Sequence, residues 1–97
     1  MPAVAERVLD VSGLEPPEPL VQALEAAERL SSGDYLRMLH RREPCLLYPY
    51  LDAGGFASET RAGRETAVEV FVWRRGDEAA EAAARAVAEA LPPWEDG

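Results

Sequence analysis

Three residue types are missing from this chain of 97 residues: lysine, isoleucine and asparagine. All ten basic residues are therefore arginine. The codons of the three missing residues are AT-rich, so their absence indicates a GC-rich genome, which we expect to be bacterial. It carries no information about chemistry.

Cysteine and long apolar runs are also scarce. The single cysteine, Cys45, excludes a disulfide within the chain and agrees with a reducing compartment. No apolar run approaches the ~20 residues that a bilayer span requires, and Glu6 and Arg7 interrupt the start of the chain before a signal-like stretch develops. We therefore expect a cytoplasmic protein with no membrane contact.

The composition is that of an ordinary globular domain. Apolar residues make up 47% of the chain and charged residues 29%. A chain of this length builds one modest core, so residues 1–97 are expected to form one domain. The net charge is −8, with −5 on residues 1–34, +2 on residues 35–75 and −5 on residues 76–97. Because an acidic chain repels a phosphate backbone, nucleic acid is not an expected partner.

Hydrophobic periodicity predicts seven elements. Alternating residues predict strands over 7–11, 35–40, 56–60 and 66–73, and helical spacing predicts helices over 20–30, 45–52 and 77–91. Asp77 is the expected N-cap of the last helix, and Pro49 is expected to make the middle helix irregular or split. The order β-α-β-α-β-β predicts an α+β fold, a two-layer sandwich with a four-stranded mixed sheet, a core over about 8–75 and an added C-terminal helix.

The last strand is apolar on both faces. Its valines would face the two helices, while a second apolar group would face away from them: Tyr35, Leu39, Phe71 and Trp73. An uncovered patch of this kind is unusual on a monomer. We therefore expect either the C-terminal helix or a second subunit to cover it, and a homodimer could form through this sheet face or through the C-terminal helix.

The segment from Leu9 to Leu20, LDVSGLEPPEPL, resembles the start of the TusA/SirA-like sulfur-carrier superfamily. Those proteins open with a strand, Gly-Leu, and Cys-Pro-x-Pro at the first helix. Gly13, Leu14, Pro17 and Pro19 match this pattern, whereas Pro16 stands in the place of the carrier cysteine. The chain is more similar to a branch of bacterial domains of unknown function with a Leu-Glu-Pro-Pro-Glu-Pro opening and a second proline segment, here Pro44 to Leu47. The resemblance implies the β-α-β-α-β-β fold.

The missing cysteine changes the chemistry expected at this position. Carrier chemistry needs a thiolate at a helix N-terminus, and proline supplies neither a nucleophile nor an N–H. We expect the two proline segments to form a partner-docking surface instead, although the prolines could also serve only to fix the turn into the helix. The candidate binding residues are Glu15, Pro16, Pro17, Glu18, Pro19, Pro44 and Leu47.

Cys45 is the alternative functional residue. It follows Pro44, and His40, Arg41 and Arg42 lie just upstream, where positive charge can favour a thiolate. A sulfur or redox carrier using Cys45 is therefore the second hypothesis, against an apolar packing role for this cysteine. His40 is expected to be a packed or capping residue, and no metal site is expected because the chain has no second cysteine or histidine.

No nucleophile–base–acid set and no glycine-rich phosphate loop is present in the sequence. We therefore expect a domain that is not an enzyme and takes no cofactor. The sequence favours a non-catalytic interaction or adaptor module whose protein partner is unknown.

Overall fold

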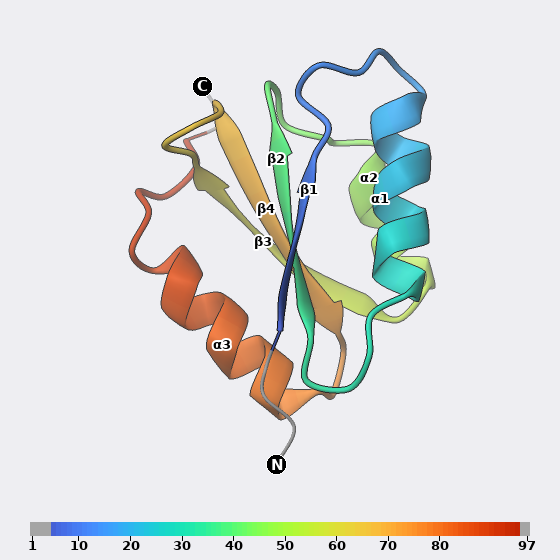
Figure 1. Ribbon diagram of the computed structural model, residues 1–97, viewed down its shortest axis with the longest axis vertical. Coiled ribbons are helices and arrows are strands. Elements are labelled where there is room, and N and C mark those ends of the chain that lie inside the picture. The colour runs from blue at the N-terminus through green and yellow to red at the C-terminus, as the bar shows by residue number, and fades with distance from the viewer. Residues whose placement is uncertain (1–4, 96–97) are drawn as a thin grey trace.

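The computed structural model describes residues 5–95. Its strands and helices follow one another as β1 (Glu6–Asp10), α1 (Glu18–Glu28), β2 (Tyr35–His40), α2 (Leu47–Ala53), β3 (Phe56–Ala62), β4 (Val68–Arg74) and α3 (Glu78–Ala88) (Figure 1). This order confirms the predicted fold class. No helix in the described range is long and apolar enough to cross a membrane.

The four strands form one mixed sheet in the order β1-β2-β4-β3. Strands β1 and β2 are parallel, whereas β4 is antiparallel to both of its neighbours. A parallel pair needs a crossover connection, and α1 supplies it. Because β1 and β2 end at the same edge of the sheet, the segments that follow Asp10 and His40 lie close together.

Helices α1 and α2 cover one face of the sheet (Figure 1). The valines at alternate positions of β4 face these helices, as their spacing predicts. The residues at the centre of this core are fully or almost fully buried: Ala23, Ala27, Leu36, Met38, Leu47, Leu51, Val68, Val70 and Val72. Burial of these side chains stabilises the layer that holds both proline segments.

Helix α3 covers the opposite face and adds a third layer to the predicted sandwich (Figure 1). Its buried alanines, Ala80, Ala84 and Ala88, allow the helix backbone to approach Phe71 and Trp73. The predicted cover by the C-terminal helix is thus confirmed. The second apolar group, Tyr35, Leu39, Phe71 and Trp73, is buried within the chain. It therefore offers no exposed surface to a second subunit while α3 is in place.

Helix α2 begins two residues later than predicted and is not split. Its N-cap is Leu46 and its first residue is Leu47, so Pro49 lies in the first turn. The first-turn N–H groups have no acceptor within the helix, and proline is tolerated there. The expectation of an irregular helix was wrong for this reason, and Cys45 lies in the turn before the helix.

Other boundaries differ by one to three residues. Helix α1 begins at Glu18 rather than residue 20 because Pro19 also fits a first helical turn. Helix α3 ends at Ala88 rather than residue 91. In the hairpin, Gly63 N donates to Ala67 O (3.1 Å), so the turn lies two residues later than predicted and β4 begins at Val68.

Asp77 is the N-cap of α3, as predicted. One carboxylate oxygen accepts from Ala80 N at 3.2 Å and the other from Gly33 N at 2.7 Å. The hydrogen bond from Gly33, followed by the one from Ala80, lowers the pKa of Asp77. This side chain therefore joins the turn before β2 to the start of α3.

Candidate functional site

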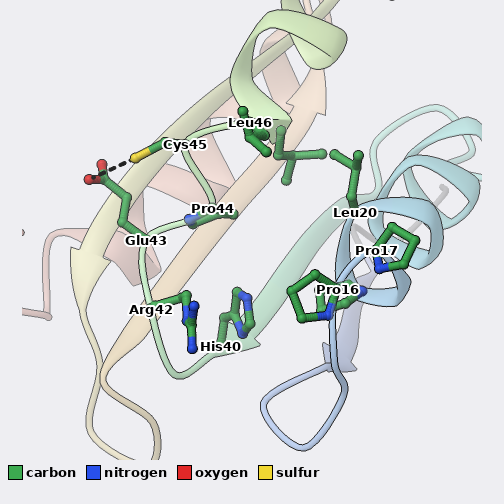
Figure 2. A pocket seen from close by; sticks show the side chains of 11 residues that line it. Pro16, Pro17, Leu20, His40, Arg42, Glu43, Pro44, Cys45 and Leu46 are labelled. Atoms are coloured by element: carbon green, nitrogen blue, oxygen red, sulfur yellow. Dashed lines mark hydrogen bonds between the residues drawn. The ribbon is translucent and has the colours of Figure 1, made fainter.

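A pocket of about 300 Å³ lies where the segments after β1 and β2 meet (Figure 2). We call it the proline pocket. Its lining comes from the loop into α1, the end of β2 and the turn into α2: Pro16, Pro17, Pro19, Leu20, His40, Arg42, Glu43, Pro44, Cys45, Leu46 and Leu47. Most of these side chains are apolar, so the pocket is suited to an apolar group.

One wall of the proline pocket is formed by the three prolines of the opening motif. Pro19 is buried in the first turn of α1, whereas Pro16 and Pro17 are exposed. The Pro16–Pro17 peptide bond is cis. Pro17 is the N-cap of α1, and its side chain makes no capping hydrogen bond. The prolines bring no N–H group to this wall, which therefore cannot cradle an anion as a helix N-terminus usually does.

The other wall is a compact turn before α2. Leu47 N donates to Pro44 O at 2.9 Å, and Cys45 N donates to Glu43 O at 3.0 Å. These bonds place Leu47 in the core, where it is 1% exposed, while Leu46 is 78% exposed. The turn thus presents a large apolar side chain to solvent beside the pocket.

His40 contributes a buried polar group to the pocket. The residue is 5% exposed, and its Nδ1 has no hydrogen-bond partner in the described part of the chain. Burial, and then the charges of Arg41 and Arg42, lower the pKa of His40. The imidazole is therefore neutral at pH 7. Figure 2 shows its ring between the side chains of Pro16 and Arg42.

The two arginines after β2 have different surroundings. Arg41 forms an ion pair with Glu15 at 3.2 Å, and neither residue lines the pocket. Arg42 lines the pocket and makes no ion pair with another residue in the range 5–95. Positive charge at the pocket is thus available from Arg42.

Cys45 lies at the outer side of the turn. Its residue is exposed, and its Sγ donates to Glu43 Oε1 at 3.5 Å, away from the proline wall (Figure 2). The other oxygen of Glu43 accepts from Tyr48 Oη at 3.2 Å, and Tyr48 Oη also bonds Thr60 Oγ1 at 2.6 Å. Burial raises the pKa of Tyr48 to about 12. This cluster therefore keeps Tyr48 protonated and ties the turn before α2 to β3.

The predicted site residues are only partly gathered in the pocket. Those that line it are Pro16, Pro17, Pro19, Pro44, Cys45 and Leu47. Glu15 and Glu18 do not line it: Glu15 pairs with Arg41, and Glu18 accepts from Gln22 Nε2 at 3.5 Å.

Sequence reasoning missed several lining residues. His40 is packed as expected, but its Nδ1 has no hydrogen-bond partner among residues 5–95, and neither Arg42 nor the apolar side chains of Leu20 and Leu46 were among the candidate binding residues. Leu46 follows the Pro-Cys pair directly, and Leu20 follows the last proline of the opening motif. The positions of Pro19 and Pro44 therefore indicated where Leu20 and Leu46 lie along the chain, but not the direction of their side chains.

Among residues 5–95, no group of three or more histidine, cysteine, aspartate or glutamate side chains is arranged to hold a metal ion. The pocket therefore offers apolar contact, the imidazole of His40, the guanidinium of Arg42, and the carboxylate of Glu43 hydrogen-bonded to the thiol of Cys45. This combination can bind a ligand but brings no obvious set of reacting groups together.

A family model described as "Uncharacterized conserved protein (DUF2249)" matches residues 8–74. The chain belongs to this family. The DUF2249 match includes the sheet from Val8 onward, α1, α2 and every residue of the proline pocket, and it ends before α3. No curated protein and no solved structure matches the chain significantly.

Proposed function

We propose that this DUF2249 domain is a non-catalytic protein-interaction module, an adaptor that binds its partner at the proline pocket. The observation that carries the proposal is the meeting of both proline segments around one apolar pocket. The rigid prolines, and Leu20 held in α1, lose little conformational entropy when a partner binds. Such a surface is suited to receiving an apolar side chain of another protein.

The apolar surface continues beyond the pocket along α2. Leu46 is 78% exposed and Tyr50 is 57% exposed, and they lie one helical turn apart. A small ligand inside the pocket would leave Tyr50 without contact, whereas a polypeptide can cover both. Large exposed apolar and aromatic residues are typical anchors of protein interfaces. The surface therefore favours a protein partner.

We also propose that the domain shares its scaffold with the TusA/SirA-like sulfur carriers. The element order and the opening from Leu9 to Leu20 support a TusA/SirA-like scaffold. At the position of the carrier cysteine, Pro16 faces the pocket and supplies no thiol. On this scaffold, the carrier position serves contact rather than sulfur transfer.

A sulfur or redox carrier that uses Cys45 is the alternative. The exposure of Cys45 favours it, because a carrier thiol must reach its donor and acceptor. The bond from its Sγ to Glu43 opposes it, since a neighbouring carboxylate disfavours a thiolate. Rapid labelling of Cys45 at pH 6–7, together with a detectable persulfide on it, would favour the carrier over the adaptor.

Site-specific photo-crosslinking tests the adaptor proposal. A benzoylphenylalanine placed at Leu46 of the full chain is expected to crosslink one partner in extract of the source cells, and excess unmodified chain should suppress the product. The matched control carries the same group at Val8, which is 56% exposed and lies on β1. Val8 pairs with Arg37 and thus faces the side of the sheet opposite the pocket.

Two outcomes of the crosslinking experiment would contradict the adaptor proposal. Absence of a suppressible product from Leu46, or the same products from Leu46 and Val8, would show that the proline pocket does not select a partner. A product specific to Leu46 identifies the protein for direct binding measurements.

A further inference from the structure

We infer that the partner segment received by the proline pocket carries an apolar side chain followed directly by a carboxylate, with the side chain in the pocket and the carboxylate on Arg42 and His40. The inference rests on the proposed function and specifies the chemistry of the partner. It starts from two polar groups at this pocket, the buried Nδ1 of His40 and the exposed guanidinium of Arg42, for which residues 5–95 supply no partner.

The first group is the imidazole of His40. A buried polar atom without a hydrogen bond costs free energy, and most such atoms in native proteins are satisfied. His40 Nδ1 is buried and lacks a partner among the described residues, and the ring lines the pocket. A ligand oxygen that accepts from this ring would remove the cost, which makes the pocket selective for an acceptor next to the apolar group.

The second group is the guanidinium of Arg42. In residues 35–75 the other arginines all bond carboxylates or carbonyl oxygens: Arg37, Arg41, Arg61, Arg64, Arg74 and Arg75. Arg42 has no such bond with another described residue, although it lines the pocket. Guanidinium groups bind carboxylates with paired hydrogen bonds. The carboxylate that also lines the pocket, Glu43, accepts hydrogen bonds from Cys45 and Tyr48, so the charge of Arg42 still favours an anion at this rim.

The volume of the pocket suits one amino-acid side chain better than a larger ligand. About 300 Å³ lies at the lower end of the range for small-molecule sites. It accommodates one leucine, methionine or phenylalanine side chain, while Leu46 and Tyr50 remain available to the flanking polypeptide. The apolar walls and the polar rim thus match two successive residues of a peptide.

Peptide titrations followed by NMR of the full ¹⁵N-labelled chain test this inference. The probe is a pool of acetyl-Gly-Gly-Φ-Asp-Gly-Gly-amide peptides in which Φ is leucine, methionine or phenylalanine. Its matched control has asparagine in place of aspartate. We expect the aspartate pool to shift the signals of His40, Arg42 and Leu46 and to bind about fivefold more tightly than the asparagine pool.

Substitutions of Arg42 and His40 separate the contributions of the guanidinium and the imidazole to peptide binding. Arg42→Gln should abolish the preference for the aspartate pool, whereas Arg29→Gln should retain it, because Arg29 is an exposed arginine at the other end of α1. His40→Phe should weaken both pools by removing the hydrogen bond while keeping the ring. If His40→Phe does not fold, the surface variant Arg42→Gln still decides the question.

Other results would overturn the inference. Equal binding of the aspartate and asparagine pools, or a preference that survives Arg42→Gln, would exclude the carboxylate. Binding of 4-phenylbutyrate at the pocket more tightly than either pool would indicate a small-molecule acid in place of a peptide. If the partner crosslinked at Leu46 binds the chain equally well in wild type and Arg42→Gln, the inference fails while the proposed function stands.

Discussion

Glu69 is a fully buried carboxylate in the middle of an apolar strand. Its side chain is 0% exposed, Arg37 Nε donates to its Oε1 at 2.6 Å, and Arg64 N donates to Oε2 at 3.1 Å. Glu6 lies 3.7 Å from the same guanidinium. A buried charge without such partners would be strongly destabilising. Glu69 and Arg37 therefore join β4 to β2 on the face that α3 covers.

Replacing Glu69 with glutamine is expected to lower the free energy of unfolding by about 3 kcal/mol, because Arg37 loses its charged partner in a largely buried place. Urea denaturation at pH 7 measures the loss. Glu89→Gln, on the exposed side of the end of α3, is the matched control and should leave the free energy of unfolding nearly unchanged. Equal stability of the two variants would show that the buried ion pair is not needed.

For single residues, the sequence indicated which face of a strand a side chain occupies more reliably than which residue it contacts. Alternation along β4 correctly separated the valines from Phe71 and Trp73. It did not reveal that Glu69 is buried, because its partner Arg37 comes from another strand. His40 was expected to be packed, and it is, but no pattern along the chain reports that a buried nitrogen lacks a hydrogen bond.

Among the helices of the described chain, α3 has a side-chain N-cap, whereas α1 and α2 have none. Asp77 bonds both Ala80 N and Gly33 N, so the same carboxylate begins the helix and fixes the turn before β2. Sequence reasoning predicted the cap but not the bond to Gly33, which lies 44 residues away along the chain. The helix length was overestimated because its alanine-rich pattern continues to Leu91, whereas the chain leaves the helix after Ala88.

The lowered pKa of Asp77 gives a pH-dependent prediction. A carboxylate with a depressed pKa in the folded state stabilises the fold above its unfolded pKa, and this stabilisation is lost as the pH falls through the folded value. Asp77→Ala is therefore expected to lower the urea midpoint at pH 7. The difference from wild type should shrink below about pH 4, the ordinary range of an aspartate. Urea midpoints of both proteins between pH 2.5 and 7 measure it, and a difference independent of pH would contradict the ionic role of the cap.

For the whole molecule, the arrangement of the site follows from the topology. The parallel pairing of β1 and β2 brings the proline loop and the turn after His40 to one edge of the sheet, although Pro16 and Pro44 are far apart in the sequence. The predicted element order made this meeting foreseeable, in agreement with the expectation that the two proline segments form one surface. The pocket itself depends on side-chain directions, in particular the outward Leu46 and the inward Leu47, which periodicity over so short a turn cannot predict.

The division of the molecule into two faces also bears on function. Helix α3 and its alanines close one face of the sheet, while the opposite layer carries the proline pocket and the exposed residues of α2. The matched DUF2249 segment contains the pocket and stops before α3. Partner binding is therefore expected in the α1–α2 layer, while α3 covers the opposite face of the sheet.

Binding of the partner at the proline pocket is the proposal on which the other predictions depend. It is tested by measuring the affinity of the purified partner for two surface variants. Isothermal titration should show that Leu46→Arg weakens binding about tenfold or more, while Val8→Arg on the opposite face binds like wild type. Equal affinity of wild type and Leu46→Arg, with both proteins folded, would contradict the account.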